Sequence, residues 1–368
     1  MRVSDTGPAR TRTRPHRPPE RCSCHRRLPC VMPLRTTSER KIIARTFGRR
    51  RKRKRAGDRK RRVQWASARA LFKGLRLSLS PSDALLCGMR LTRDTVCVIT
   101  GAGGGIGRAL ALALAREGCV LALADNNEHN IAATAADAKK AGAARVSAHA
   151  VDVADLAAMT RFRDEVAQAH GRVQLLINNA GVALNGELEE VSVDDMRWLV
   201  DINFWGTVYG TRLFLPLLRQ QREAQIVNVS SIFGIMAVAG QTAYAASKFA
   251  VRGFSEALRH ELADSRIVVT TVHPSGVRTN IARDARAPDK FDPLRRDAMI
   301  AGFDKLARTT PEQAAARIVR GVKRGEQRII LGRGSKLMAA LAWLMPVRYW
   351  RIVDRPLAPM ALRKPRRR

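Results

Sequence analysis

Seven short apolar runs alternate with helical segments between residues 96 and 331, and this alternation constrains the fold more than any other feature. Strands that are apolar along their whole length are typical of a parallel sheet whose two faces are covered by crossover helices. Right-handed crossovers place the ligand crevice at the carboxyl ends of such strands. We therefore predict an α/β fold, a doubly wound parallel sheet of about seven strands with helices on both faces.

The pattern sets the expected elements of this single domain. The strands are expected at Val96–Thr100, Val120–Asp125, Arg145–Asp152, Val173–Asn179, Gln225–Ser231, Ile267–His273 and Gln327–Leu331. The helices are expected at Gly107–Glu117, Glu128–Ala141, Leu156–His170, Val193–Arg219, Tyr244–Leu262 and Pro311–Lys323. Residues 89–335 would form this domain, between extensions at residues 1–88 and 336–368.

The N-terminal extension differs from the domain in composition. Residues 1–88 contain 26 of the 67 Lys and Arg but 5 of the 32 Asp and Glu, and such a block should be disordered. A nucleic-acid-binding arm, a nuclear or heparin-type patch and a transit peptide are open alternatives. Because Met89 directly precedes the lead-in to the first strand, we favour a start assigned too early. We do not expect nucleic-acid binding.

The cysteines and the hydropathy bear on compartment and metal. The six cysteines show no disulfide framework, which favours a reducing, cytoplasmic location. Cys22, Cys24, His25 and Cys30 could supply soft ligands but lack paired C-x-x-C motifs, so no metal site is expected. No apolar run reaches the roughly 18 residues of a spanning helix, and no secretory signal is present.

The C-terminal extension is amphipathic and basic. In residues 336–351, apolar side chains and Trp are bracketed by Lys and Arg, a pattern that could lie in a membrane interface. Packing over a substrate pocket or against another subunit explains the same pattern equally well.

A glycine-rich turn joins the first strand to the first helix. It reads Thr100-Gly101-Ala-Gly-Gly-Gly105-Ile106-Gly107 and has the spacing G-x-x-x-G-x-G. Glycines let the backbone approach a pyrophosphate, whose charge is met by N–H groups at the helix N-terminus. The turn therefore indicates a nucleotide site.

Asp125 ends the second expected strand, 18 residues after Gly107. A carboxylate there can accept hydrogen bonds from the adenosine ribose hydroxyls and would repel a 2′-phosphate. Neither Gly104 nor Asn126 supplies a basic group for such a phosphate. NAD is therefore expected in preference to NADP.

Tyr244 and Lys248 are four residues apart in an expected helix and so share one face. A nearby ammonium favours the phenolate and should lower the tyrosine pKa from its usual value of about 10. A phenol of lowered pKa can exchange protons with an alcohol or ketone.

Over residues 93–332, the chain resembles the short-chain dehydrogenase/reductase family, because six motifs occur in that family's order. The glycine turn looks like its cofactor turn, Asp152 is similar to its adenine-contacting aspartate, and Asn178-Asn179-Ala-Gly181 is similar to the motif that steadies the sheet beside the cofactor. Asn203 and Ser231, which lies 13 residues before Tyr244, match two members of its catalytic tetrad.

The sixth motif, Pro274-Ser275-Gly-Val-Arg-Thr279, resembles the segment that covers the nicotinamide amide, with Ser275 where glycine is usual. The resemblance implies a Rossmann fold and an NAD(P)-dependent oxidoreductase that acts on CH–OH donors. Cofactor contacts are then expected from Gly101, Gly105, Ile106, Gly107, Asp125, Asp152, Asn179, Lys248, Pro274 and Thr279.

The resemblance also implies the catalytic roles. Tyr244 would transfer the proton and Ser231 would hydrogen-bond the substrate oxygen. Lys248 would bind the nicotinamide ribose and lower the Tyr244 pKa, and Asn203 would hold a water that links Lys248 to solvent. Tyr244, Ser231, Lys248 and Asn203 are the expected catalytic residues, and a homodimer or homotetramer joined by the two longest helices is the expected assembly.

The substrate side is expected to be apolar. Residues 281–307 form a charged stretch with helix-breaking residues after the sixth strand, where the resemblance implies a mobile substrate lid. No basic residue is clearly placed for a carboxylate, although Arg278 and Arg283 are near in sequence. A secondary alcohol or ketone of apolar character is the expected small-molecule substrate. The alternative hypothesis is a nucleotide-sensing or nucleic-acid-binding protein that uses the Arg-rich arm. The residues expected to line the pocket are Val182, Ala183, Leu184, Ile232, Phe233 and Met236.

Overall fold

The computed structural model describes residues 88–288 and 291–357. The Arg-rich arm and the Cys22–Cys30 cluster lie outside these residues, as does the C-terminal end beyond residue 357. Among the residues that are described, no helix is long and apolar enough to cross a membrane.

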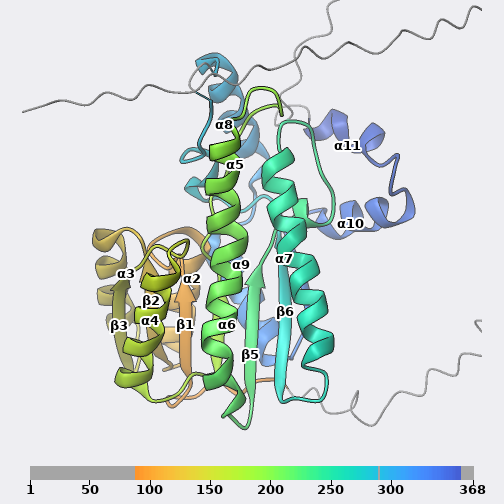
Figure 1. The fold of residues 1–368 in the computed structure, drawn as a ribbon. Coiled ribbons are helices and arrows are strands. Elements are labelled where there is room, and N and C mark those ends of the chain that lie inside the picture. Colours follow the sequence, from red (N-terminus) through yellow and green to blue (C-terminus); the bar gives the residue numbers. More distant parts are fainter. Residues whose placement is uncertain (1–87, 289–290, 358–368) are drawn as a thin grey trace, which may run out of the picture. The chain divides into compact units, whose positions relative to one another are not determined.

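Seven parallel strands form the sheet, in the order β3-β2-β1-β4-β5-β6-β7 (Figure 1). The chain runs outward from β1 to β3 and then returns to place β4 on the other side of β1, which creates a topological switch point between β1 and β4. The strands are β1 (Val96–Thr100), β2 (Val120–Asp125), β3 (Arg145–Ala150), β4 (Leu175–Asn178), β5 (Ala224–Val229), β6 (Ile267–Pro274) and β7 (Arg328–Leu331).

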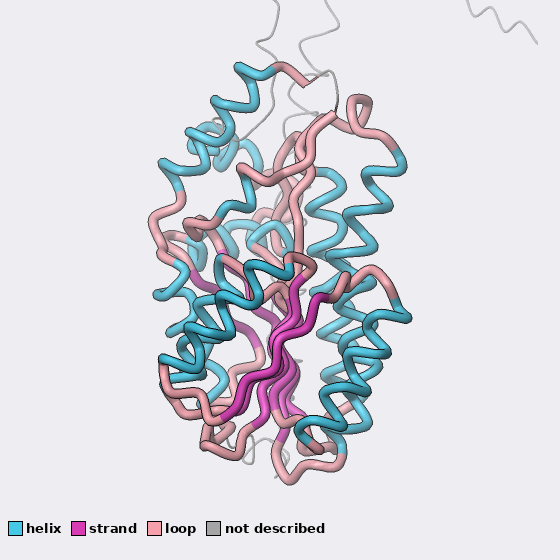
Figure 2. Tube along the Cα trace, turned by 90° about the vertical axis from the view of Figure 1, so that its left-hand side faces the viewer, coloured by secondary structure: helices cyan, strands magenta, loops and turns pink. Residues whose placement is uncertain are grey.

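Helices cover both faces of the sheet, which Figure 2 shows edge-on. On one face, α2 (Gly105–Arg116), α3 (Glu128–Lys140) and α9 (Pro311–Lys323) pack in one apolar cluster with β1, β2 and β7. On the other face, α4 (Leu156–His170), α6 (Gly206–Arg219) and α7 (Thr242–Glu261) pack against the same sheet. The inner strands β1, β2, β4, β5 and β6 are buried on both faces for this reason, whereas the edge strand β3 is exposed or half-buried along its length. The predicted doubly wound fold is confirmed.

The predicted boundaries of β1, β2, α4 and α9 agree with the structure, and several others differ by a few residues. The strand expected at Arg145–Asp152 ends at Ala150, because Asp152 begins a turn in which its carboxylate accepts the Ala154 N–H at 2.9 Å. The first helix begins at Gly105, two residues before the expected start, because the end of the glycine turn is already helical.

The helix expected at Val193–Arg219 is interrupted. It consists of α5 (Val193–Val200), a π-helical segment η2 (Asp201–Trp205) and α6. Within η2 the Gly206 N–H bonds to the Asp201 carbonyl, five residues back rather than four. A π segment of this kind is an uncommon departure from the α-helix and is frequent at functional sites. The helical range predicted from Val193 to Arg219 agrees with the structure, but the π segment within it was not predicted.

The stretch expected as a lid contains regular structure. Asn280–Ala282 form a 3₁₀ turn, η4, and α8 (Pro293–Leu306) follows with Asp292 as its N-cap. The Ala183 carbonyl accepts the Arg286 N–H, and the Arg286 carbonyl accepts the Asn185 N–H. The stretch is therefore tied to the loop after β4.

Two further helices follow β7, namely α10 (Ser335–Leu344) and α11 (Trp350–Leu357). Their inward side chains, Ala342 and Val353, belong to the same apolar cluster as Tyr244. Figure 1 shows both helices beside the upper end of α7.

Candidate active site

The glycine turn requires two of its glycines for packing. Gly101 has a φ of +64°, and a Cβ there would lie 2.7 Å from the Ala180 Cα. A Cβ at Gly107 would lie 2.0 Å from the Gly101 carbonyl oxygen. Both positions therefore exclude larger residues, and the turn is held close to the end of β4.

The other side of the turn is open. A Cβ at Gly104 would have no heavy atom within 4 Å, and Gly105 faces the Thr279 methyl group. No side chain caps the N-terminus of α2, and no acidic residue occupies its first turn. A helix start with these properties suits a phosphate group, so the turn fits the pyrophosphate of a dinucleotide.

Asn179 ties this turn to the sheet. Its amide nitrogen donates to the carbonyls of Thr100 and Gly101, both at 3.0 Å. Its backbone N–H bonds to the Thr100 hydroxyl at 3.1 Å. The contacts of Asn179 in the structure are therefore with the backbone that shapes the turn.

Asp125 lies against the glycine turn at the end of β2. One carboxylate oxygen accepts the Gly103 N–H at 2.8 Å, and the other accepts the Asn127 N–H at 3.0 Å. A Cβ at Gly103 would lie 2.8 Å from the Asp125 carboxyl carbon, so the carboxylate is fixed next to the turn. Asp125 is half-buried and keeps lone pairs for a ribose hydroxyl.

The other expected cofactor residues differ in how closely the structure ties them to the glycine turn. Thr279 lies beside Gly105, which places the 274–279 segment across from the glycine turn. Pro274 ends β6, and Ile106 packs partly buried at the start of α2. Asp152 is exposed, and a bond to the Ala154 N–H is the contact that its carboxylate makes.

Asn203 is completely buried in the π-helical segment. Its Oδ1 accepts the Val182 N–H at 2.8 Å, and its Nδ2 donates to the Val182 carbonyl at 3.0 Å. Its Nδ2 also lies 3.1 Å from the Ser247 hydroxyl of α7. Asn203 thus joins the loop after β4 to the helix that carries Tyr244 and Lys248.

Ser231 follows β5, and its hydroxyl accepts the Phe233 N–H at 3.1 Å. The same hydroxyl forms a hydrogen bond with the Tyr244 phenol. Its carbonyl accepts the Nδ1–H of His273 at 2.9 Å, which fixes the tautomer because a carbonyl has no proton to donate. Burial lowers the pKa of His273 to about 4, so this imidazole is neutral near pH 7.

Tyr244 and Lys248 lie on one face of α7, with the Lys248 Nζ 5.8 Å from the centre of the Tyr244 ring. Burial raises the pKa of Tyr244, and the hydrogen bond with Ser231 opposes this rise. Burial lowers the pKa of Lys248 to about 8, and its Nζ donates to the Val229 carbonyl at 3.2 Å. The expected lowering of the tyrosine pKa by Lys248 is therefore not found in the structure, because desolvation of the phenolate is the larger effect.

The four expected catalytic residues are brought together. A Cβ added to Gly181 would lie 3.0 Å from both the Asn203 Oδ1 and the Lys248 Nζ. These two side chains therefore lie close to each other beside Gly181. Tyr244 and Ser231 are joined by their hydrogen bond. The arrangement unites a buried phenol, a hydroxyl and an ammonium at the carboxyl end of the sheet.

An apolar cluster continues from Tyr244 on the substrate side. The Phe233 ring meets the Tyr244 ring edge to face at 6.2 Å. The pocket residues that the sequence indicated all pack in this cluster, with Val182 and Ala183 partly buried and the other four buried. The Tyr349 hydroxyl closes it from the C-terminal side, because it accepts the Ala237 N–H at 2.8 Å and donates to the Ala237 carbonyl at 3.2 Å.

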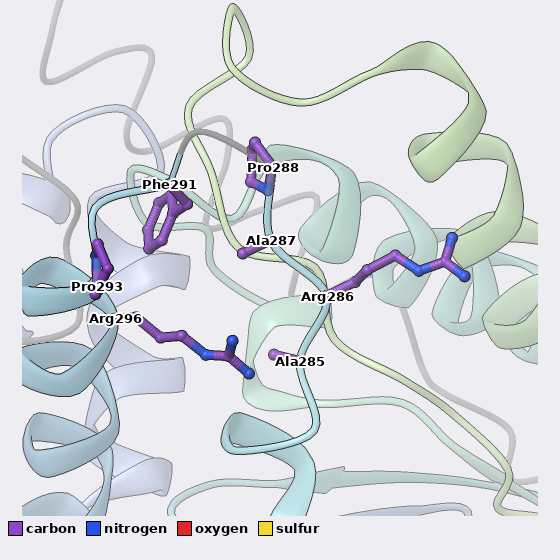
Figure 3. A pocket seen from close by; sticks show the side chains of 7 residues that line it. All are labelled: Ala285, Arg286, Ala287, Pro288, Phe291, Pro293 and Arg296. Atoms are coloured by element: carbon purple, nitrogen blue, oxygen red, sulfur yellow. The ribbon is translucent and has the colours of Figure 1, made fainter.

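A cavity of about 440 Å³ opens in the stretch that was expected as a lid (Figure 3). None of the four residues that are expected to be catalytic lines it. Arg296 of α8 points into it, whereas Arg286 extends away to stack on Trp198, 3.8 Å from the ring centre. The cavity is lined by Ala285, Arg286, Ala287, Pro288, Phe291, Pro293 and Arg296.

The sequence analysis missed three residues of this region. The sequence could have indicated His273, because this histidine directly precedes the Pro274 motif at the end of a buried strand. Arg296 lies in a charged stretch without helical periodicity. Tyr349 is 112 residues from its partner Ala237, and no local pattern reports such a contact. Of the basic residues near in sequence, Arg278 donates to the Ala307 carbonyl at 3.0 Å, and Arg283 pairs with Asp304 at 2.6 Å.

Comparisons with known proteins agree with this geometry. A family model described as short chain dehydrogenase matches residues 95–290. The chain is 43% identical over 261 residues to the putative oxidoreductase SadH of Mycobacterium tuberculosis, which covers 70% of this chain and 93% of that protein. A crystal structure of a short-chain dehydrogenase/reductase from Burkholderia phymatum in complex with NAD is 30% identical, with a TM-score of 0.65, and the match covers 70% of this chain and 96% of that one.

The levodione reductase structure is a further match, at 25% identity and a TM-score of 0.60, covering 67% of this chain and 99% of that one. The sequence matches, the seven-stranded parallel sheet and the assembled site point to the same family. The chain belongs to the short-chain dehydrogenase/reductase family and is an oxidoreductase of that type.

Proposed function

We propose that this enzyme transfers a hydride between NAD(H) and a secondary alcohol or ketone of apolar character, with Tyr244 as the acid/base group. The observation that carries the proposal is the position of the Tyr244 phenol. It is buried at the edge of an apolar cluster, hydrogen-bonded to Ser231, and flanked on its own helix by a buried ammonium.

The cofactor, when bound, supplies the hydride acceptor or donor. The fit of the chain to a dinucleotide rests on the open, uncapped start of α2 and on the packing that holds the glycine turn close to β4. The 274–279 segment faces this turn across Gly105, so it would lie along the nicotinamide half. The bound NAD in the Burkholderia phymatum relative supports this assignment.

The roles of the catalytic residues follow from their contacts. Tyr244 gives its proton to a ketone oxygen, or takes one from an alcohol, while Ser231 hydrogen-bonds the same oxygen and stabilises its developing charge. Lys248 carries a positive charge below a pH of about 8 and holds the nicotinamide ribose hydroxyls. Asn203 fixes the loop at Val182, and its amide oxygen and the Lys248 ammonium both lie next to Gly181, which supports a role for Asn203 in linking Lys248 to solvent through a water.

The preference for NAD over NADP is proposed from Asp125. Its carboxylate is fixed against the glycine turn by the Gly103 N–H, where a 2′-phosphate would meet a like charge. The hydroxyls of an unphosphorylated adenosine ribose would instead donate hydrogen bonds to the Asp125 carboxylate.

A homodimer or homotetramer joined through α6 and α7 is the proposed assembly. Trp205, which directly precedes α6, is 42% exposed and Phe249 of α7 is 40% exposed. Large apolar side chains that remain open on two long helices are typical of subunit interfaces.

The test is an oxidation assay with a panel of apolar secondary alcohols, with NAD and NADP supplied separately. Appearance of the reduced nicotinamide is expected with NAD, and primary alcohols of matched length serve as controls. Failure to reduce either cofactor with any alcohol, and failure to oxidise NADH with the matching ketones, would contradict the proposal.

A further inference from the structure

Helix α10 is apolar around its whole circumference but is covered on one face only. Lys336 is its one charged residue. Ala342 faces the protein interior, while Trp343 on the next position is 81% exposed. A helix that is apolar on all sides usually lies in a protein core or a membrane. The outer face of α10 is apolar but is not covered by other residues of the described chain.

The exposed apolar surface continues beyond α10 into α11. Val347 in the connecting turn is 79% exposed, more than most apolar residues of the described chain. We call the whole surface the C-terminal apolar face. It consists of Leu337, Trp343, Leu344, Val347, Trp350 and Ile352.

Positive charge accompanies this face. Residues 333–353 contain four basic residues, Arg333, Lys336, Arg348 and Arg351, but no acidic residue. Lys336, Arg348 and Arg351 are exposed beside the apolar side chains, and the Arg351 guanidinium lies 5.5 Å from the centre of the Trp350 ring. Tryptophan and basic residues around an apolar surface match the interface of an anionic bilayer, where the ring lies at headgroup level and the cations meet lipid phosphates.

The inner side of the same helices borders the substrate side of the active site. Ala342 and Val353 pack in the apolar cluster that contains Tyr244. Tyr349 holds the Ala237 backbone by two hydrogen bonds, a few residues from Phe233. One segment therefore separates the outer apolar face from the pocket proposed for an apolar substrate.

We propose that α10, the turn at residues 345–349 and the start of α11 dock on an anionic lipid surface, and that the enzyme takes its apolar substrate from that surface. Charge decides between lipid and a second copy of this chain. A second copy would bring the same excess of positive charge to the contact, whereas anionic headgroups would neutralise it. The delivery of substrate rests on the proposed function, whereas the docking does not.

Co-sedimentation of the full chain with vesicles of phosphatidylglycerol and phosphatidylcholine tests the docking. The paired change of Trp343→Ser and Val347→Ser should weaken binding about 10-fold or more, because it removes two apolar anchors of the face. The control pair, Leu188→Ser and Val193→Ser, removes side chains that are both 61% exposed elsewhere and should bind as the unmodified chain does. All variants carry the same basic residues 1–88, so a difference between the pairs reports the C-terminal face.

Tryptophan quenching by brominated lipid supplies a second measurement. Vesicles that carry bromine on the acyl chains should quench the emission of the unmodified chain, and the double change of Trp343→Phe and Trp350→Phe should remove most of this quenching while it keeps binding. Quenching that is unchanged in this double variant, or equal binding by both serine pairs, would overturn the docking. A change from dimer to monomer in the Trp343/Val347 pair, with vesicle binding unaltered, would show that the face is a subunit contact instead.

The delivery of substrate has its own readout. Anionic vesicles should increase kcat/KM for a long-chain secondary alcohol and leave kcat/KM for a short, water-soluble one unchanged. The Trp343/Val347 pair should lose the increase and keep turnover of the soluble alcohol. Loss of turnover with the soluble alcohol in the unmodified chain would count against the proposed function, whereas equal vesicle effects on both alcohols would count against delivery.

Discussion

The hydroxyl of Ser230 donates a hydrogen bond to the main-chain carbonyl of Lys248 at 2.8 Å. Both groups are buried, and a Cβ at Gly234 would lie 2.3 Å from the Ser230 Oγ and 2.7 Å from the Lys248 carbonyl oxygen. The residue that follows β5 is therefore joined through its side chain to the backbone in the middle of α7. This contact sets the position of α7 relative to the end of β5, and with it the distance between the Tyr244 phenol and the Ser231 hydroxyl. A proton-transfer site must keep these two groups within hydrogen-bond distance.

The Lys248→Met variant should be more stable than the unmodified enzyme but inactive. The buried ammonium has its pKa lowered from 10.5 to about 8, which corresponds to about 3 kcal/mol of destabilisation near neutral pH. Methionine removes this cost and forfeits the hydrogen bond to the Val229 carbonyl, worth about 1 kcal/mol. A net gain of about 1–2 kcal/mol is expected in urea unfolding at about pH 7.

The pH dependence separates the charge from other effects of this substitution. Between about pH 8 and about pH 10.5, the unfolded chain holds a proton on Lys248 that the folded chain has lost, so stability rises with pH in this window. The rise should be smaller in Lys248→Met. Equal slopes for both proteins would show that burial of the charge has no such cost.

The Asp125→Asn variant should relax the preference for NAD. Asparagine keeps an acceptor for the Gly103 N–H and the shape of the side chain but removes the charge that would oppose a 2′-phosphate. The ratio of kcat/KM for NADP to that for NAD should increase about 10-fold or more, since like charges in contact cost several kcal/mol and about 1.4 kcal/mol is tenfold. An unchanged ratio, measured with one alcohol, would remove Asp125 from cofactor selection.

The His273→Asn variant should remove part of the acid sensitivity of the fold. Burial holds the pKa of His273 at about 4, against 6.5 for an exposed imidazole, so the unfolded chain binds a proton first as the pH falls. The folded state therefore loses stability from about pH 6.5 downward. Asparagine keeps a donor for the Ser231 carbonyl without a titratable ring.

Urea unfolding at about pH 7 and about pH 5 measures this difference. The unmodified enzyme should lose about 2 kcal/mol more than His273→Asn between the two conditions. His170 also has its pKa lowered by burial, and it is unchanged in both proteins, so its contribution cancels. An identical loss in both proteins would show that His273 titrates near its ordinary pKa.

The fold was predictable where burial dictates the sequence. Strands β1 and β2 occur where the apolar runs indicated them, because both of their faces are covered and nearly every position is apolar. The glycine turn was predictable for a similar reason, since Gly101 and Gly107 occupy positions where a Cβ would collide with backbone. Burial and close backbone contacts restrict which residues can occupy these positions, so the residues in turn predict the local structure.

Other features depend on contacts that are distant in the sequence. The π segment around Asn203 lies within an otherwise α-helical run, and no residue pattern marks it. The raised pKa of Tyr244 depends on how completely the phenol is buried, which the spacing to Lys248 does not report. Helix α8 was missed because its apolar residues do not gather on one face.

The Tyr244→Phe variant tests the central claim most directly. Phenylalanine keeps the ring that packs against Phe233 and removes the hydroxyl that bonds to Ser231, so the fold and the cofactor crevice should be unaffected. NADH binding, followed by fluorescence titration, should match the unmodified enzyme, while turnover of the best secondary alcohol should fall by about 10²-fold or more. Undiminished turnover with normal NADH binding would contradict the assignment of Tyr244 as the proton-transfer group.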